Sequence, residues 1–190
     1  RRSSRPSGWW TATAASAAAF KPNAAFFEAL GPEGVQVLKQ VIAAVPEGIP
    51  VILDAKRGDI ASTAEAYASA AFEAFKAHAL TASPYLGKDS LDPFLKDPAH
   101  GVFLLCKTSN LGAGDLQDVL LAGVEQNTLY EKVARLANLW NQNDNLGLVV
   151  GATHPEALRR VRALAPHLWF LAPGVGAQGA ELETALAAGL

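Results

Sequence analysis

Short apolar runs alternate with longer amphipathic stretches along this 190-residue sequence, and this alternation limits most strongly what the chain can fold into. The clearest run, residues 50–56 (PVILDAK), is rich in β-branched residues and opens with proline, as buried strands do. Four further runs are each closed by polar, glycine or proline residues: 78–83, 102–107, 146–151 and 168–172. Residues 14–20 are a candidate for a sixth strand.

Segments with helical spacing of their apolar residues separate these runs: 25–44, 62–77, 126–140, 155–165 and 180–188. Ser62 and Glu65 form an S-x-x-E capping box, which predicts a helix start. His154 followed by Pro155 marks the entry of another helix. Apolar strands that are buried on both faces and separated by helices predict a parallel α/β sheet. A (β/α) barrel and an open doubly wound sheet both satisfy this pattern.

The composition predicts a single domain with a real core, since half of the residues are hydrophobic and 18% are charged. The formal charge of −2 lacks the basic footprint of proteins that bind nucleic acid or anionic membranes. No apolar run approaches the roughly 18 residues of a membrane-spanning helix. A single cysteine, Cys106, excludes an intramolecular disulfide, and its apolar strand predicts a buried, inert thiol. We therefore expect a cytoplasmic protein without nucleic-acid or membrane partners.

Residues 1–19 differ from the rest of the chain, because they carry three arginines, many serines and alanines, and no acidic residue. This composition resembles an organellar transit peptide. We favour the alternative of a foreign or misread leader, since residues 21–27 follow without a linker and already look like domain sequence. The expected organisation is an atypical leader at 1–19 and one domain at 20–190.

Polar residues gather directly after the apolar runs, where parallel α/β proteins place their function. Asp54 and Lys56 lie two apart on a strand, so their side chains are expected to leave the same face. With Lys21 and Asp59 they would form a chain of alternating charge, which keeps an ammonium protonated and suits proton delivery to a carbanion. A strand-end salt bridge without chemistry explains the spacing equally well.

Residues 174–179 (GVGAQG) formally match G-x-G-x-x-G, but no acidic residue follows about 20 positions on, as a dinucleotide site needs. We expect instead a phosphate cradle of backbone amides with Gln178 as a side-chain donor, or a tight strand-to-helix turn. The neutral polar side chains of residues 108–110 suit recognition of a polar ring such as a nucleobase, and a turn motif is the alternative.

Four motifs occur together and in order: FKPN at residues 20–23, DAKRGDI at 54–60 followed by Thr63, KTSN at 107–110 and PGVGAQG at 173–179. In this order they resemble the orotidine 5′-phosphate decarboxylase family, in its longer bacterial-type branch. The resemblance covers residues 20–190. The D-x-K-x-x-D pattern alone would also fit the related 3-keto-gulonate-phosphate decarboxylases.

The resemblance implies a (β/α)8 TIM-type barrel that works as a homodimer, without cofactor or metal, and converts orotidine 5′-monophosphate to UMP and CO2 in pyrimidine biosynthesis. Lys56 would donate the proton to the pyrimidine C6. Asp54 would lie against the departing carboxylate, and Lys21 would complete the charge network and touch the ribose.

The remaining motif positions imply substrate contacts and a shared active site. Asp59, Ile60 and Thr63 would reach into the site of the partner subunit. Ser109 would hydrogen-bond the pyrimidine. The phosphate would be held by the loop of Pro173, Gly176 and Gln178.

Two departures from the family pattern limit this expectation. Members carry a first strand that ends in an aspartate and an eighth strand followed by a phosphate-binding arginine, and this sequence shows neither. We therefore expect a barrel truncated at both ends, with weak activity or none. The alternatives are a metal-dependent sugar-phosphate decarboxylase, a non-catalytic nucleotide-binding remnant and, ranked lower, a Schiff-base lyase that uses Lys56.

Overall fold

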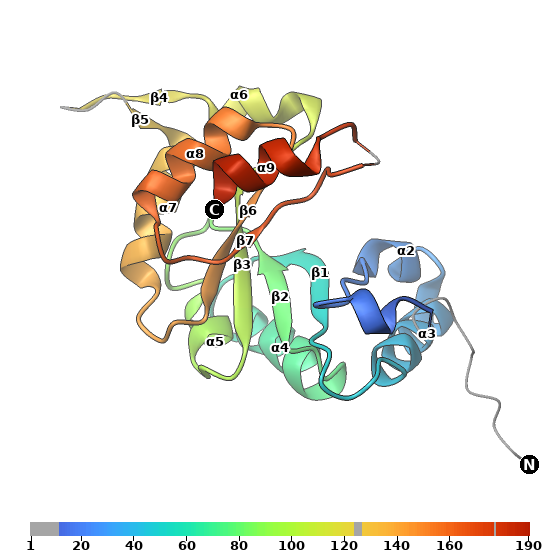
Figure 1. Ribbon diagram of the computed structural model, residues 1–190. Coiled ribbons are helices and arrows are strands. Elements are labelled where there is room, and N and C mark those ends of the chain that lie inside the picture. Colours follow the sequence, from blue (N-terminus) through green and yellow to red (C-terminus); the bar gives the residue numbers. More distant parts are fainter. Residues whose placement is uncertain (1–11, 124–126, 177) are drawn as a thin grey trace, which may run out of the picture.

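The computed structural model of the protein describes residues 12–123, 127–176 and 178–190 (Figure 1). Five parallel strands form the main sheet in the order β1-β2-β3-β6-β7. Their bounds are β1 Ile52–Arg57, β2 Ala79–Ala82, β3 Gly101–Lys107, β6 Leu146–Val150 and β7 Phe170–Leu171. These strands confirm the five apolar runs of the sequence, although β7 is shorter than expected.

The predicted sixth strand at residues 14–20 is wrong in its extent. Ala14–Ser16 form a short 3-10 helix, η1. An extended segment, residues 20–23, instead runs parallel to the start of β1 through isolated bridges from Phe20 to Val51 and from Asn23 to Asp54. The parallel neighbour of β1 therefore lies a few residues later in the chain than the apolar pattern predicted.

The order of these segments decides between the two architectures that the sequence left open. From residues 20–23 through β7, each main-sheet strand is added beside the one before it along the chain. A doubly wound sheet reverses its order at a switch point, whereas a barrel keeps adding strands at the same edge. The described residues therefore follow the winding of a (β/α) barrel.

Helices cover the sheet and join its strands: α2 Ala24–Glu28, α3 Gly31–Ala43, α4 Ala61–Ser69 with the π-helix η2 Ala70–Ala74, α5 Asp92–Leu95, η3 Leu111–Ala113, α6 Gly114–Gln117, α7 Leu129–Trp140, α8 Pro155–Leu164 and α9 Leu182–Gly189. A small antiparallel pair, β4 Leu120–Leu121 and β5 Asn127–Thr128, precedes α7. Figure 1 shows α2 and α3 at the β1 end of the sheet, and α7 and α8 beside β6 and β7. Within the described residues, no helix is long and apolar enough to span a membrane.

The core lies between the sheet and these helices. Leu104 of β3, Leu148 of β6, Ala134 of α7 and Val161 of α8 are fully buried in one apolar cluster. Strands β2 and β6 are buried along their whole length, as predicted. Strand β3 alternates instead between buried and half-buried residues, so one of its faces is less covered than the sequence indicated.

Two predicted helices differ from the structure for local reasons. The stretch at 25–44 is broken, because Gly31, the first residue of α3, adopts a φ of +69°, and Pro32 follows it in the first turn. The predicted capping box of Ser62 and Glu65 is wrong, since α4 begins after Ile60, whose side chain makes no capping hydrogen bond.

A capping box that the sequence analysis did not identify opens α7 between Thr128 and Glu131. It moves the helix start from the predicted residue 126 to Leu129. Residue 126 itself lies outside the described residues. At the next helix, His154 is the N-cap of α8 and Pro155 stands in its first turn, which confirms the predicted entry.

The reactivity of the Cys106 thiol tests whether β3 is buried in this core. It is 2% exposed, and its thiol donates to the Tyr130 carbonyl at 3.3 Å. Burial raises the pKa of the thiol to about 12, against the lowering effect of the Lys107 charge. At pH 8 we expect iodoacetamide to label the folded protein on the order of 1,000-fold more slowly than the denatured protein, because the thiolate fraction is that much smaller. Mass spectrometry of timed samples measures both rates, and equal rates would show that β3 is not protected.

Candidate functional site

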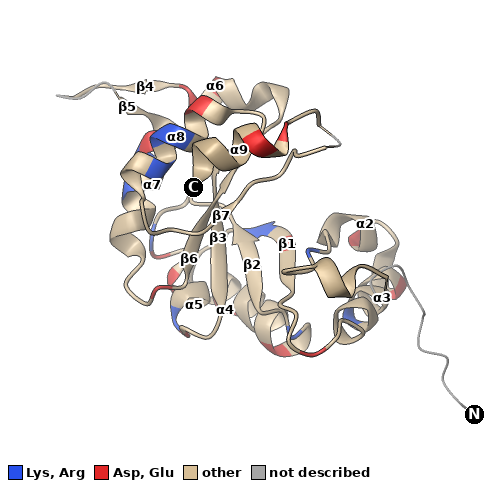
Figure 2. Ribbon diagram, in the orientation of Figure 1, with Lys and Arg blue, Asp and Glu red and all other residues tan. Residues whose placement is uncertain are grey.

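The candidate site lies at the carboxyl ends of the parallel strands. Because the strands run the same way, the residues that follow them meet at one edge of the sheet. Charged residues occur mostly on helices and loops, and Figure 2 shows basic residues at the carboxyl end of β1. The side chains of Lys21, Asp54 and Lys56 gather there, as the sequence predicted.

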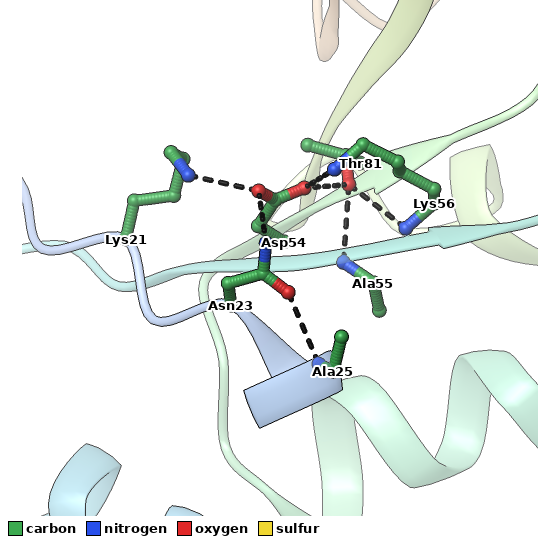
Figure 3. A network of polar contacts seen from close by, with 7 residues as sticks. All are labelled: Lys21, Asn23, Ala25, Asp54, Ala55, Lys56 and Thr81. Carbon is green, nitrogen blue, oxygen red and sulfur yellow. Dashed lines mark hydrogen bonds and ion pairs between the residues drawn. The ribbon is translucent and has the colours of Figure 1, made fainter. Parts of the chain in front are cut away.

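Asp54 is the centre of this group and is only 7% exposed. Its Oδ2 accepts hydrogen bonds from Lys21 Nζ at 2.9 Å and from Asn23 Nδ2 at 3.4 Å. Its Oδ1 accepts from Lys56 Nζ at 2.6 Å and from Thr81 Oγ1 at 2.9 Å (Figure 3). Each carboxylate oxygen therefore has two donors, so the buried charge is compensated on both sides.

Backbone pairing along β1 positions Lys21 and Asn23. The Ile52 amide donates to the Phe20 carbonyl at 2.8 Å, and the Asp54 amide donates to the Pro22 carbonyl at 3.0 Å. Asn23 then caps α2, since its Oδ1 accepts from the Ala25 amide at 3.0 Å while its Nδ2 reaches Asp54. The Asn23 side chain thus links the start of a helix to the carboxylate, a role that the sequence analysis did not assign.

Lys56 sits at an irregular point of β1. Its φ is +47°, a left-handed conformation that is rare outside glycine, and the β1–β2 register shifts between Leu53 and Arg57. The predicted contact between Asp54 and Lys56 is confirmed, but the strand between them is bulged and not regular. Such backbone strain is typical of functional sites.

The two lysines remain reachable from solvent, with side chains 33% and 49% exposed for Lys21 and Lys56. Burial alone raises the pKa of the Asp54 carboxyl. Hydrogen bonds from Lys21, Lys56 and Thr81 and the charge of Lys21 outweigh burial and hold this pKa below its ordinary value. At neutral pH Asp54 is therefore an ionised carboxylate that pairs with two lysine side chains, of which Lys56 is half-exposed.

Asp59 does not join this group within the chain, so the predicted series of four alternating charges is not formed by one chain. Its Oδ1 accepts from the Ile60 amide at 2.8 Å, and both lysines pair with Asp54 and not with Asp59. Ile60 is 57% exposed, and Thr63 is exposed in the first turn of α4. The donors to the Asp54 carboxylate in the described part of the chain include none of these three residues.

The segment that carries Ser109 is held by two side chains that follow it. Gln117 accepts from the Thr108 amide at 2.9 Å and donates to the Thr108 hydroxyl at 2.8 Å. Buried Lys107 donates to Asp118 at 2.6 Å and lies over the Tyr130 ring. Lys107 therefore anchors the loop, which leaves recognition to its neighbours.

Gly151, after β6, lets Ser109 approach closely. A Cβ at Gly151 would lie 3.2 Å from the Ser109 Cβ and 3.3 Å from its backbone nitrogen. Within the described part of the chain, the Ser109 hydroxyl has no hydrogen-bond partner, so it is available to a ligand at the mouth of the sheet.

The glycine loop after β7 is a tight turn whose amides are partly used. The Gly176 amide donates to the Ala180 carbonyl at 3.2 Å, and the Gly179 amide donates to the Gly176 carbonyl at 2.9 Å. The Gly176 amide is therefore not free for the predicted phosphate cradle. Gly174, which follows Pro173, has a φ of +111°, a conformation that favours glycine. A Cβ added at Gly174 would lie only 2.9 Å from Gln178 Oε1. The Gln178 side chain therefore folds back over this turn.

Among the residues described, no group of three or more His, Cys, Asp and Glu side chains is arranged to hold a metal ion. Three further residues belong to the site although no sequence motif assigned them a role there: Thr81, Asn23 and Gln117. A hydroxyl inside the apolar run at 78–83 was a usable signal for Thr81, because a buried hydroxyl needs a partner. Gln117 had no such signal, since it lies nine residues after Thr108 along the chain.

The lowered pKa of Asp54 predicts a pH dependence of stability. A carboxyl with a lowered pKa contributes stability above its unfolded pKa near 4, and this contribution is lost as the pH falls through the folded pKa. We expect Asp54→Asn to be less stable than wild type at pH 7, with the difference shrinking below about pH 4. Urea unfolding followed by circular dichroism from pH 7 to 2.5 measures it.

The control is Asp144→Asn, at an exposed turn where the carboxylate accepts only from Asn141. Its effect on stability should be small across this range. A stability difference for Asp54→Asn that stays constant down to pH 2.5 would contradict the stabilising ion pairs.

Comparison with known proteins agrees with this geometry. The family model for the orotidine 5′-phosphate decarboxylase / HUMPS family matches residues 10–185, so the match begins inside the segment at 1–19 that the composition set apart. The chain is 56% identical over 171 residues to the orotidine 5′-phosphate decarboxylase of Roseiflexus sp. (strain RS-1). This alignment covers 90% of the chain and 62% of that relative, so the chain spans about three fifths of the relative's length.

Solved structures are similar over nearly the whole chain. The structure of Leishmania donovani UMP synthase superposes with a TM-score of 0.90 at 61% identity, covering 94% of this chain and 40% of that one. Leishmania donovani OMP decarboxylase gives a TM-score of 0.89 at 58% identity, covering 95% of this chain and 70% of that one. The parallel sheet is thus part of a (β/α)8 barrel. With the four ordered motifs and the charged group at the strand ends, these matches show that the chain belongs to the orotidine 5′-phosphate decarboxylase / HUMPS family.

Proposed function

We propose that this chain carries the active site of an orotidine 5′-phosphate decarboxylase, which forms UMP and CO2 in pyrimidine biosynthesis. The observation that carries the proposal is the group of Lys21, Asp54 and Lys56, in which two ammonium groups flank one buried carboxylate. Named relatives with 52–56% identity support the substrate.

In the proposed step, the bond between C6 and the carboxylate carbon breaks and CO2 leaves. The electron pair that remains on C6 takes a proton from Lys56 Nζ, and the neutral amine regains a proton from solvent. The Lys56 ammonium is half-exposed, and its contact with Asp54 Oδ1 at 2.6 Å fixes its direction. No cofactor or metal takes part in this proposed step.

Asp54 acts on the substrate through its charge. Because it stays ionised, it repels a substrate carboxylate placed beside it, and this repulsion disappears as neutral CO2 forms. The enzyme then binds the transition state more tightly than the substrate. Lys21, on the opposite oxygen of Asp54, is exposed enough to contact the ribose as well.

The remaining residues would bind the nucleotide. The Ser109 hydroxyl would hydrogen-bond the pyrimidine. The Gln178 side chain would hold the phosphate, since it lies over Gly174 in the loop that also contains Pro173 and Gly176. The Gly176 amide would shape this loop through its bond to Ala180 and would not bind the phosphate. Binding energy from the distant phosphate would help to offset the repulsion at C6.

The proposal includes a homodimer in which Asp59, Ile60 and Thr63 complete the partner's site. In support, these residues do not touch the carboxylate of their own chain, and Ile60 exposes an apolar side chain. The loops after β1 and β2 approach each other closely at Gly58, where an added Cβ would lie only 3.3 Å from the Ser83 Cβ. The loop after β2 also carries Tyr85, whose side chain is 78% exposed. We also propose a cytoplasmic location, in keeping with the free buried thiol of Cys106.

The activity itself is tested by an ultraviolet assay of the 190-residue chain on orotidine 5′-monophosphate. If the described part of the barrel suffices for activity, we expect weak turnover that persists in EDTA, and a loss of at least about 1,000-fold in Lys56→Ala, because no other group replaces the proton donor. Lys88→Ala is the matched control, since it removes only a surface ion pair with Asp92.

A folded wild-type chain that shows no turnover would refute the activity of this chain. Loss of turnover in EDTA would instead indicate a metal-dependent decarboxylase.

The shared site predicts the outcome of mixing two inactive variants. Lys56→Ala lacks the proton donor, and Asp59→Ala lacks the residue that enters the partner's site. A mixed dimer contains one intact site, built from Lys56 of one chain and Asp59 of the other. After random exchange of subunits, we expect about one quarter of the wild-type rate. A mixture of Lys56→Ala with the double variant should stay inactive, and recovery that does not exceed the sum of the separate variants would contradict the shared site.

A further inference from the structure

Thr81, in β2, is the buried hydroxyl closest to the chemistry of the candidate site. It is 1% exposed and uses its side chain entirely on neighbouring β1 (Figure 3). Its Oγ1 accepts from the Ala55 amide at 3.1 Å and from the Lys56 amide at 2.9 Å, and it donates to Asp54 Oδ1 at 2.9 Å. Two accepted bonds and one donated bond exhaust what a hydroxyl can make.

The two accepted bonds compensate for the bulge in β1. Pairing between β1 and β2 is regular at Leu53 and resumes only at Arg57, so the residues between them have no register partner in β2. The Thr81 hydroxyl takes the place of the missing backbone carbonyl. It thereby stabilises the left-handed conformation of Lys56. Without this acceptor, the two amides at the bulge would each lose a hydrogen bond.

The donated bond fixes the carboxylate. Thr81 and the Lys56 ammonium share Oδ1 of Asp54, while Lys21 takes Oδ2. The hydroxyl therefore stabilises both the backbone from which the Lys56 side chain starts and the carboxylate at which its ammonium ends. Any buried threonine needs a partner for its hydroxyl, but here all three bonds go to the backbone and carboxylate of the candidate site.

We propose that Thr81 is a positioning residue, whose hydroxyl sets the location of the Lys56 ammonium by holding the Lys56 backbone and Asp54 Oδ1. It touches no substrate. Its consequence for catalysis rests on the proposed decarboxylation, whereas its action on Lys56 and Asp54 does not.

The test compares Thr81→Val, which keeps the shape and removes the hydroxyl, with Thr81→Ser, which keeps the hydroxyl. In Thr81→Val we expect the Ala55 and Lys56 amides to exchange with solvent at least about tenfold faster by NMR, and the pKa of Asp54 to rise. Thr81→Ser should leave both close to wild type. Thr128→Val is the control, because it removes the hydroxyl of the α7 capping box, far along the chain from β1.

With orotidine 5′-monophosphate as substrate, we expect kcat to fall about 10- to 100-fold in Thr81→Val, because a displaced proton donor misses C6. The Kd for UMP should change less than threefold, and Thr81→Ser should recover most of kcat. Thr128→Val should lower the melting temperature without this loss of kcat.

The outcomes separate this inference from the proposed function. If wild type shows no turnover, the proposed function fails, and the exchange and Asp54 titration still decide the role of Thr81. Unchanged amide exchange and an unchanged Asp54 pKa in Thr81→Val would overturn the inference, as would equal damage in Thr81→Ser. If Thr81→Val does not fold, Thr81→Ser and Thr81→Cys provide a second comparison, because these variants differ only in an oxygen or a sulfur atom. Equal amide exchange and an equal Asp54 pKa in these two variants would overturn the inference.

Discussion

A buried carboxylate between two ammonium groups is the interaction around which the rest of this structure is arranged. Asp54 is almost fully buried, and an unpaired charge there would be very costly. Its four donors come from three adjacent parts of the sheet: residues 20–23, β1 and β2. The charge therefore requires these segments to keep their register. Any shift would leave both a carboxylate and two lysines without partners.

The parallel winding of the sheet turns this local requirement into a functional site. Because every strand in the described part of the main sheet runs the same way, the polar loops with Ser109 and Gln178 lie at the same edge as the charged group. Helix α7 packs on β3 and β6, and α8 packs against α7, so both helices add to the apolar cluster behind that edge. The site combines a rigid charged group on strands with loops that are held by their own side-chain bonds, such as those from Gln117 to Thr108.

The strand runs and the motif that contains Asp54 and Lys56 could be predicted because each depends on neighbours in the sequence. The contact between these two side chains was expected from the period of a strand, and it exists at a bulge where that period fails. The predicted capping box at Ser62 failed for a related reason. A sequence pattern offers a cap, but tertiary packing decides where the helix starts, and here it starts after Ile60.

By itself, the sequence determined the α/β class, the order of the strands along the chain and which charged residues follow them, since hydrophobic periodicity and spacing are local properties. Only the tertiary structure decided that the sheet winds as part of a barrel, and that Asn23 and Thr81 share Asp54 with the lysines while Asp59 does not. Those contacts join residues 27 to 33 positions apart in the chain. They depend on strand register, which is set by the packing of the whole sheet and not by any short segment.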